Sequence, residues 1–201
     1  VGGFMIRVGV IFGGESVEHE VSIISAVQAM NKMDSEKYEI VPIYITKDGE
    51  WYFYTGDIDS IESNTWFNDE DTTPAVLSPD KKDKALIILN DMGAYEKIKI
   101  DVIFPVLHGK NGEDGTIQGI FELAGIPYVG CTPLASGMCM DKAITNTLAD
   151  AAGINGAKWV AFTETDYKDG RVNFEVIEQK LGYPIFVKPA NAGSSVGISK
   201  A

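Results

Sequence analysis

The sequence predicts an α/β fold, in which helices cover both faces of a mostly parallel, doubly wound sheet over residues 5–130. Two observations support this prediction. Short apolar runs rich in β-branched residues end in glycine turns, and apolar residues at helical spacing follow these turns. Buried strands that alternate with helices form parallel sheets, because each helix returns the chain to the same end of the sheet.

The chain contains 201 residues, of which 45% are hydrophobic, and this length suffices for a sizeable core in one or two domains. The net charge of −12 argues against a nucleic-acid partner, because phosphates attract a basic surface. No apolar run approaches the roughly 18 residues that cross a bilayer, and no secretory leader is seen, so no membrane partner is expected. Cys131 and Cys139 form neither a disulfide framework nor a metal cluster, which favours the reducing cytoplasm.

The first predicted strand covers residues 7–12 and enters a tight turn at Gly13-Gly14. The helix that follows has apolar residues every three positions, which predicts one buried side. These residues are Val21, Ile24, Val27 and Met30.

A hairpin is expected after this helix. Residues 38–46 and 51–54 are rich in β-branched and aromatic residues, and Asp48-Gly49 between them is typical of a hairpin turn. Residues 57–84 are acidic and rich in turn formers, which predicts an exposed excursion, and residues 85–89 predict an edge strand.

The most hydrophobic segment, residues 100–107, predicts a central strand. Pro105 removes a hydrogen-bond donor from the ladder, so we expect it near the end of that strand. A helix is expected over residues 116–123, with Gly125 as its C-terminal stop.

From residue 131 to residue 201 the pattern becomes that of a smaller α+β unit. We expect the strand that pairs with residues 183–188 to follow residue 200, which leaves the loop over residues 192–201 without a partner and disordered. The expected elements are helices over 133–140, 141–152 and 174–181, and strands over 159–163 and 183–188.

Three segments lie where an open α/β sheet binds ligands, beyond the carboxyl ends of its strands. The first, residues 13–22, places Glu15, Glu18 and Glu20 near the start of the first helix. Such carboxylates either complement the helix dipole or bind the ammonium group of a ligand, and the residues alone leave both interpretations open.

The second segment, residues 107–118, contains three glycines after a buried strand, so its backbone must turn tightly. Glu113 and Asp114 either cap the next helix or contribute to a site. A structural and a functional role fit His108 equally well, so this loop is a candidate site on sequence grounds alone.

The third segment combines Lys188, at the end of an apolar strand, with a loop that holds Ser194 and Ser195 between two glycines. Lysine, serine and backbone N–H groups bind phosphate oxygens, although a lysine at a strand end is also commonly just solvated. Lys142, at a helix start, is a weaker candidate of the same kind. The P-loop and G-x-G-x-x-G fingerprints are absent from the sequence, as are a histidine-cysteine metal cluster and a serine-histidine-acid set.

Five motifs occur in order along the chain. Gly-Gly-x-Ser-x-Glu-x-Glu-Val-Ser is followed by Leu-His-Gly-x-x-Gly-Glu-Asp-Gly-x-Ile-Gln-Gly, Met-Asp-Lys, Val-Lys-Pro and Gly-Ser-Ser-Val-Gly. From about residue 6 to the end of the chain, this order resembles the D-alanine-D-alanine ligases, which are cytoplasmic, usually dimeric ATP-grasp enzymes of peptidoglycan precursor synthesis. The resemblance implies a Rossmann-like, pre-ATP-grasp domain over residues 5–130 and a truncated ATP-grasp lobe over residues 131–201.

The resemblance also implies roles for the matching residues of the first domain. Glu18 corresponds to the glutamate that faces the ammonium group of the first D-alanine. His108 corresponds to the histidine near the carboxylate of that substrate. Both residues are therefore expected to bind the first amino acid, with Glu18 also taking part in catalysis.

In the second domain the resemblance implies a nucleotide site. Lys142 and Lys188 correspond to lysines that contact the phosphates of ATP, and Ser195 belongs to the loop that covers them. Ser194 corresponds to a serine that is linked by hydrogen bonds to the motif glutamate, and it is expected to take part in catalysis and in ATP binding. The ligands of the magnesium (or manganese) ion are expected beyond Ala201, so we expect no dipeptide from this chain alone.

The implied reaction passes through an acyl phosphate. ATP transfers its γ-phosphoryl group to the carboxylate of the first D-alanine, and the amine of a second amino acid then displaces phosphate. Two questions stay open at this point. The second substrate is D-alanine, or it is D-serine or D-lactate, and the chain as it stands is part of an enzyme or a non-catalytic nucleotide-binding or dimerisation fragment.

Overall fold

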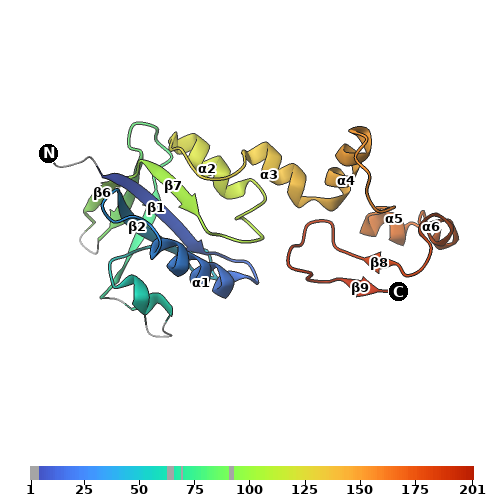
Figure 1. The fold of residues 1–201 in the computed structure, drawn as a ribbon, viewed down its shortest axis with the longest axis horizontal. Coiled ribbons are helices and arrows are strands. Elements are labelled where there is room, and N and C mark those ends of the chain that lie inside the picture. The colour runs from blue at the N-terminus through green and yellow to red at the C-terminus, as the bar shows by residue number, and fades with distance from the viewer. Residues whose placement is uncertain (1–4, 63–65, 69, 91–92) are drawn as a thin grey trace. The chain divides into compact units, whose positions relative to one another are not determined.

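The computed structural model describes residues 5–62, 66–68, 70–90 and 93–201 of the chain (Figure 1). The chain divides into two compact units, Val1–Ser136 and Gly137–Ala201. The predicted limits of the two domains at residues 130 and 131 stay a prediction. The units are described separately below.

The first unit contains a seven-stranded sheet with the strand order β6-β5-β4-β3-β2-β1-β7. The α/β class is confirmed, but the sheet is mixed, because β1 is parallel to β2 and β7 whereas the other four pairings are antiparallel. The strands are β1 (Ile6–Gly13), β2 (Tyr38–Ile45), β3 (Trp51–Tyr54), β4 (Thr72–Leu77), β5 (Ala85–Leu89), β6 (Tyr95–Lys99) and β7 (Val102–Pro105).

Hairpins replace helical crossovers after β2, and this makes the sheet mixed. The predicted turn at Asp48-Gly49 is confirmed, since β2 and β3 pair antiparallel and Gly49 adopts a φ of 85°. The prediction of an exposed excursion over residues 57–84 is wrong. These residues contain a 3-10 helix (Ile58–Glu62), the buried Trp66 and the sheet strand β4.

The prediction that residues 85–89 form an edge strand is wrong, because β6 pairs along the full length of β5. Strand β7, expected in the centre, is the last strand in the sheet order, next to β1. Its other side carries a parallel bridge between Ile103 and Tyr128, with backbone hydrogen bonds of 2.8 and 2.9 Å. The strand ends at Pro105, as the missing backbone donor predicted.

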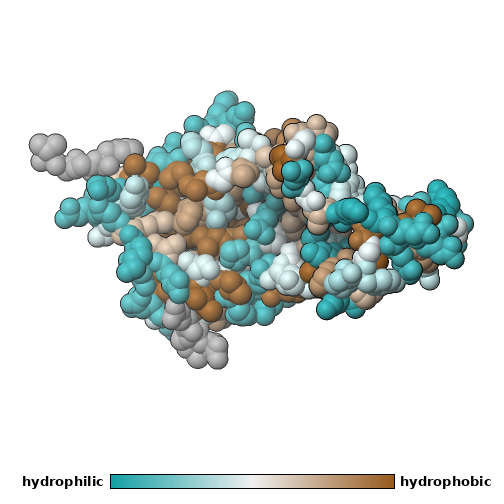
Figure 2. Space-filling model, turned by 45° about the vertical axis from the view of Figure 1, so that its right-hand side comes forward, coloured by the Kyte–Doolittle hydropathy of each residue, from teal (hydrophilic) through white to brown (hydrophobic). Residues whose placement is uncertain are grey.

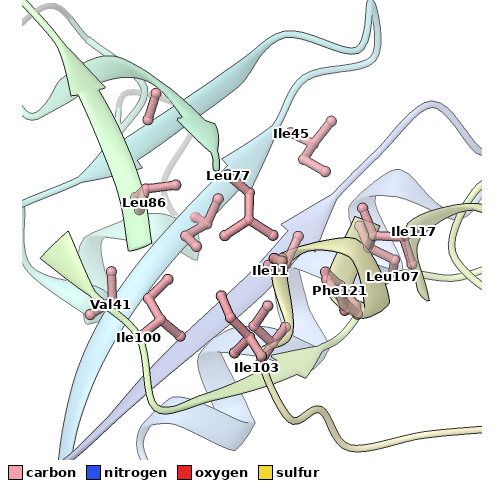
Figure 3. Close-up of a cluster of buried hydrophobic side chains, with 14 of the residues drawn as sticks. Ile11, Val41, Ile45, Leu77, Leu86, Ile100, Ile103, Leu107, Ile117 and Phe121 are labelled. Carbon is pink, nitrogen blue, oxygen red and sulfur yellow. The ribbon is translucent and has the colours of Figure 1, made fainter. Parts of the chain in front are cut away.

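One helix covers each face of the sheet, as expected for a doubly wound fold (Figure 1). Helix α2 (Thr116–Ala124) packs Ile117, Phe121 and Ala124 into a buried cluster with residues of β1, β2 and β7 (Figure 3). Its C-terminal stop at Gly125 is confirmed, with a φ of 64°. Helix α1 (His19–Met30) packs into a second cluster that includes residues of β1 on the opposite face.

The buried side of α1 differs from the predicted one. Val21 and Ile24 are 52% and 49% exposed, so the three-residue spacing marked the wrong face for these two positions. The side that faces the sheet combines apolar and polar residues at i, i+3 and i+4 spacing. Its members are His19, Ser22, Ile23, Ala26, Val27 and Met30.

The second unit is built from short helices and one strand pair. The strand predicted over residues 159–163 is absent, although all of these residues are described. The antiparallel partner of β8 is β9, so the expectation that this partner would follow residue 200 is wrong. The elements are α3 (Pro133–Met140, which crosses the unit boundary), α4 (Lys142–Ala151), α5 (Glu164–Lys168), α6 (Phe174–Leu181), β8 (Phe186–Val187) and β9 (Ser199–Lys200).

Burial differs between the two units. The buried hydrophobic residues of the described chain all belong to the first unit, whereas the fully described helices α4 and α6 contain no buried residue. The visible surface of the molecule is mainly hydrophilic, with separate hydrophobic patches (Figure 2). No helix in the described part of the chain is long and apolar enough to cross a membrane.

Candidate functional site

The Gly-Gly turn after β1 is held tightly against the end of β2. Gly13 has a φ of 89°, and a Cβ atom there would lie 2.2 Å from the carbonyl oxygen of Ile45. The Gly14 amide donates to the same carbonyl at 2.8 Å. Glycine is therefore required at Gly13, where the turn redirects the chain into α1.

Ser22 ties this turn to the strand on the other side of β1. Its buried Oγ accepts from the Gly13 amide at 2.8 Å and donates to the Val106 carbonyl at 2.5 Å. Because β1 lies between β2 and β7, the carboxyl ends of these three strands are held together. Open α/β sheets bind ligands beyond the carboxyl ends of their strands.

The loop between β7 and α2 is braced by its own carboxylates. Glu113 accepts from the Gly109 amide at 2.8 Å, and Asp114 accepts from the amides of Asn111 and Thr116 at 2.9 and 3.0 Å. Burial acts to raise the pKa of Asp114, but the hydrogen bonds outweigh burial and hold the pKa below its ordinary value. Both acids therefore shape the loop, and α2 itself starts at Gly115 without a side-chain cap.

Glu15 joins the two loops. Its carboxylate accepts from the Lys110 ammonium at 2.8 Å and from the Asn111 side-chain amide at 3.1 Å. The hydrogen bond to Glu15 raises the pKa of Lys110. The sequence motif groups Glu15 with the other two glutamates and does not reveal this link, because its partners are about a hundred positions away.

Glu18 and the His108 loop come together in the structure. The Glu18 carboxylate lies 3.3 Å from the position that a Cβ atom of Gly109 would occupy. The Glu18 side chain is half-buried and makes no hydrogen bond or ion pair to any residue that the structure describes. His108 has a buried Nε2 atom that likewise has no partner among the described residues. Among the described residues, neither group therefore has a hydrogen-bond partner that a ligand would have to displace.

In the second unit, Lys142 contacts the chain that leads into the Gly-Ser loop, residues 193–197. Its ammonium group donates to the carbonyl oxygens of Ala190 and Ala192 at 3.4 and 2.5 Å, and its backbone amide donates to Ala190 at 3.1 Å. Asp141 caps α4 and accepts from the amides of Ala143 and Ile144. The helix start and the loop are thus one connected structure.

The Gly-Ser loop exposes its donors. Ser194 and Ser195 are exposed and adopt φ values of 48° and 60°. In the fully described second unit, neither of their amides donates a hydrogen bond, and the exposed Lys188 ammonium has no partner. Free amides, hydroxyls and a lysine are a suitable donor set for phosphate oxygens.

The predicted site residues therefore form two groups. Glu18 and His108 belong to the first unit, whereas Lys142, Lys188, Ser194 and Ser195 belong to the second. Throughout the described ranges, no group of three or more histidine, cysteine, aspartate or glutamate side chains could hold a metal ion. The donors present fit a nucleotide, and they do not by themselves fit a metal ion.

Comparison with known families identifies the origin of these features. The family model described as "D-ala D-ala ligase N-terminus" matches residues 7–131, and the model described as "D-ala D-ala ligase C-terminus" matches residues 148–201. The chain belongs to the D-alanine-D-alanine ligase family. Both candidate groups fall within these matches, Lys142 excepted.

Individual relatives of this ligase family member agree with the assignment. The D-alanine--D-alanine ligase of Caldicellulosiruptor bescii is 52% identical over 98% of this chain and 53% of its own length. The structure of the VanG D-Ala:D-Ser ligase from Enterococcus faecalis is 46% identical and has a TM-score of 0.87 over 98% of this chain and 55% of that one. The Coxiella burnetii D-alanine-D-alanine ligase is 31% identical, with a TM-score of 0.84 over 98% of this chain and 56% of that one. The chain thus spans about half the length of the relatives it matches.

Proposed function

We propose that this chain is the N-terminal part of a ligase that joins two D-alanine molecules into D-alanyl-D-alanine for peptidoglycan precursor synthesis, at the expense of ATP. The observation that carries this proposal is the unpaired Glu18 carboxylate, 3.3 Å from the Cβ position of Gly109 in the His108 loop. Glu18 is half-buried at the carboxyl ends of the strands, and its carboxylate has no internal partner among the described residues. Such an anionic group suits the ammonium group of an amino acid.

Charge pairing distinguishes Glu18 from the two other glutamates of the same motif. Glu15 is paired with Lys110 at 2.8 Å, and Glu20 is paired with Lys47 at 2.8 Å. The ammonium group of a substrate would have to compete with these lysines, whereas at Glu18 it meets no competing cation from the described residues. We assign Glu18 to the ammonium group of the first D-alanine and His108 to its carboxylate.

The second unit supplies the nucleotide site in this proposal. Lys188, Ser194 and Ser195 have free donors, and Lys142 lies at the base of the same loop. Lysines and backbone amides offset the charge that the γ-phosphoryl group carries as it moves to the substrate carboxylate. The loop also excludes water from the acyl phosphate, which the amine of the second amino acid attacks with release of phosphate. Ser194 is proposed to link this loop to the Glu18 site.

Several further properties are part of the proposal. ATP is accompanied by Mg²⁺ or Mn²⁺, whose ligands we place in the half of the protein that the relatives possess and residues 1–201 do not include. The domains are proposed to be residues 5–130 and 131–201, and the enzyme to be a cytoplasmic homodimer. The family membership and the net charge of −12 are consistent with small-molecule substrates.

A second candidate is a ligase that joins D-alanine to D-serine. The 46% identity to the VanG D-Ala:D-Ser ligase structure makes this the second candidate, beside the 52% identity to the D-alanine--D-alanine ligase of Caldicellulosiruptor bescii. A ligase that uses D-lactate and a non-catalytic nucleotide-binding or dimerisation fragment complete the set of candidates.

One experiment tests the proposal and separates these candidates. The full-length enzyme, in which this sequence is continued by the half that its relatives possess, is given ATP, Mg²⁺ and D-alanine with D-serine or D-lactate in competition. We expect D-alanyl-D-alanine as the main product by mass spectrometry. A mixed product would identify the D-serine or D-lactate ligase, and the absence of any ligated product would refute the proposed activity.

A further inference from the structure

His19 connects the glycine turn to the second strand from inside the protein. The side chain is 3% exposed. Its Nδ1 atom lies 2.6 Å from the carbonyl oxygen of Gly14, and its Nε2 atom lies 3.1 Å from the hydroxyl of Tyr44 in β2. The imidazole of the residue that follows Glu18 therefore bridges the turn and the neighbouring strand.

The partners of this ring fix its hydrogen positions. A carbonyl oxygen accepts hydrogen bonds and does not donate them, so Nδ1 must carry a hydrogen. In a neutral ring Nε2 is then an acceptor, and the Tyr44 hydroxyl donates to it. Burial, together with the nearby Glu20 and Tyr52, raises the pKa of Tyr44 to about 12, so the hydroxyl keeps the proton that it donates.

The same helical turn holds the backbone of Glu18. The Glu18 amide donates to the Ser16 hydroxyl at 3.0 Å, and the Glu18 carbonyl accepts from the Ser22 amide at 2.9 Å. Ser22 in turn bonds Gly13 and Val106. Glu18 is thus attached to a helical turn whose two buried polar side chains, His19 and Ser22, are each bonded to a strand or strand end.

We propose that His19 is a positioning residue for the amino-acid site: with a hydrogen on Nδ1 it ties Gly14 to Tyr44 and so fixes the Glu18 carboxylate beside Gly109. The assignment rests on the proposed binding of the first D-alanine by Glu18. A displacement of about 1 Å at a reacting site can cost roughly a hundredfold in rate, so a brace next to Glu18 has kinetic consequences.

The tautomer is measured on the chain itself. The sequence contains two histidines, so the ¹⁵N-imidazole signals are assigned by comparing the wild type with His108→Asn. At pH 8 we expect the His19 signals to show a protonated Nδ1 and an unprotonated Nε2, whereas a solvated histidine side chain prefers the opposite tautomer. An Nε2–H tautomer, or rapid averaging of the two, would overturn the bridge.

The positioning role is measured in the full-length enzyme with His19→Phe and His19→Asn. The phenylalanine loses both hydrogen bonds, whereas the asparagine amide can still donate to the Gly14 carbonyl from the place of Nδ1. We expect His19→Phe to raise the KM for the first D-alanine at least tenfold, with the KM for ATP changed less than twofold. His19→Asn should recover at least half of that loss on a logarithmic scale.

Different outcomes refute the positioning role and the proposed function separately. Equal changes in the two Michaelis constants, or no rescue by asparagine, would mean that His19 only stabilises the fold. If His19→Phe does not fold, the KM for the first D-alanine and the KM for ATP are compared in Tyr44→Phe and in His19→Asn, because each of these variants removes one hydrogen bond of the bridge. A wild-type enzyme without ligase activity would refute the proposed function, while the tautomer measurement would still decide whether the bridge exists.

Discussion

The Lys110 ammonium lies 2.8 Å from the Glu15 carboxylate, although 95 residues separate the two positions. This pair joins the loop after β1 to the loop after β7, and it gives Glu15 an internal cationic partner. Glu20 is similarly paired with Lys47. Glu18 is therefore the motif glutamate without a cationic partner among the described residues.

Replacing Glu18 should damage the proposed amino-acid site. In the full-length enzyme we expect Glu18→Gln to lower kcat/KM for D-alanine more than tenfold, which corresponds to about 1.4 kcal/mol or more of transition-state stabilisation. Glu20→Gln is the matched control, because Glu20 lies two residues away and makes an exposed ion pair that contributes little. Steady-state kinetics measure kcat/KM for D-alanine in both variants, and an equal loss in Glu18→Gln and Glu20→Gln would remove Glu18 from the site.

Lys142 should act on the nucleotide and not on the amino acid. Its ammonium group lies at the base of the Gly-Ser loop, 2.5 Å from the Ala192 carbonyl. We expect Lys142→Met in the full-length enzyme to weaken ATP binding at least tenfold by calorimetry, because the charge that we propose to face the phosphates is lost. Lys180→Met on α6 is the control, and an ATP affinity within twofold of wild type for Lys142→Met would contradict the assignment.

Residues 1–201 alone should not form dipeptide. The unit that contains Lys142, Lys188 and the Gly-Ser loop lacks a group of metal ligands among its residues, all of which are described. Phosphate release from ATP is measured with and without D-alanine, using the full-length enzyme as the positive control. D-Alanine-dependent release by the chain alone, above the blank without substrate, would refute this expectation.

Tyr44 should make the protein sensitive to alkaline pH. Because its pKa in the folded protein is raised to about 12, the folded state keeps a proton that the unfolded state loses near pH 10. The stabilisation is complete below about pH 10 and is lost as the pH rises through 12, by up to about 3 kcal/mol for a shift of two pKa units.

Urea unfolding of the wild type and Tyr44→Phe at pH 9, 10 and 11.5 measures this effect. The lost hydrogen bond to His19 should lower the free energy of unfolding of Tyr44→Phe relative to the wild type at every pH. We expect this difference in free energy to shrink as the pH rises, since phenylalanine does not ionise and only the wild type loses the stabilisation. A difference in free energy that does not change with pH would show that Tyr44 titrates normally in the folded protein.

Phe121 should be one of the most stabilising residues of the first unit. It is fully buried in the cluster between α2 and the sheet (Figure 3). We expect Phe121→Ala to lower the free energy of unfolding by about 3–5 kcal/mol, because the substitution removes buried apolar surface and leaves a cavity. Leu123→Ala, an exposed position in the same helix, should change the free energy by less than about 0.5 kcal/mol in the same denaturation experiment.

The sequence was sufficient for the elements whose pattern is local. The strand that became β1, the Asp48-Gly49 hairpin and the Gly125 stop of α2 follow from periodicity and turn chemistry. Strand β6 has a mostly exposed, charged sequence and was not predicted, because it becomes a strand through its pairing with β5. Strand β4 was hidden by its acidic surroundings and by Pro74.

The site was predictable as a set of residues but not as an arrangement. The motifs named Glu18 and His108, yet the approach of Glu18 to Gly109, the residue after His108, depends on the parallel pairing of β1 with β7, which no local pattern specifies. The hydrogen bonds of His19 could not be foreseen for the same reason. Its burial is decided by which face of α1 packs on the sheet, and the apolar spacing suggested a different face.

The pairing of β8 with β9 has a thermodynamic consequence for the Gly-Ser loop. The ladder is extended by two hydrogen bonds between Ile185 and Ala201, at 2.8 and 3.1 Å, so both ends of the loop are already joined before a ligand arrives. The entropic cost of closing a chain segment is met during folding when the segment is tethered in this way. In the proposed nucleotide site, a phosphate would then order a short loop whose two ends are already fixed, and more of the contact energy would remain as affinity.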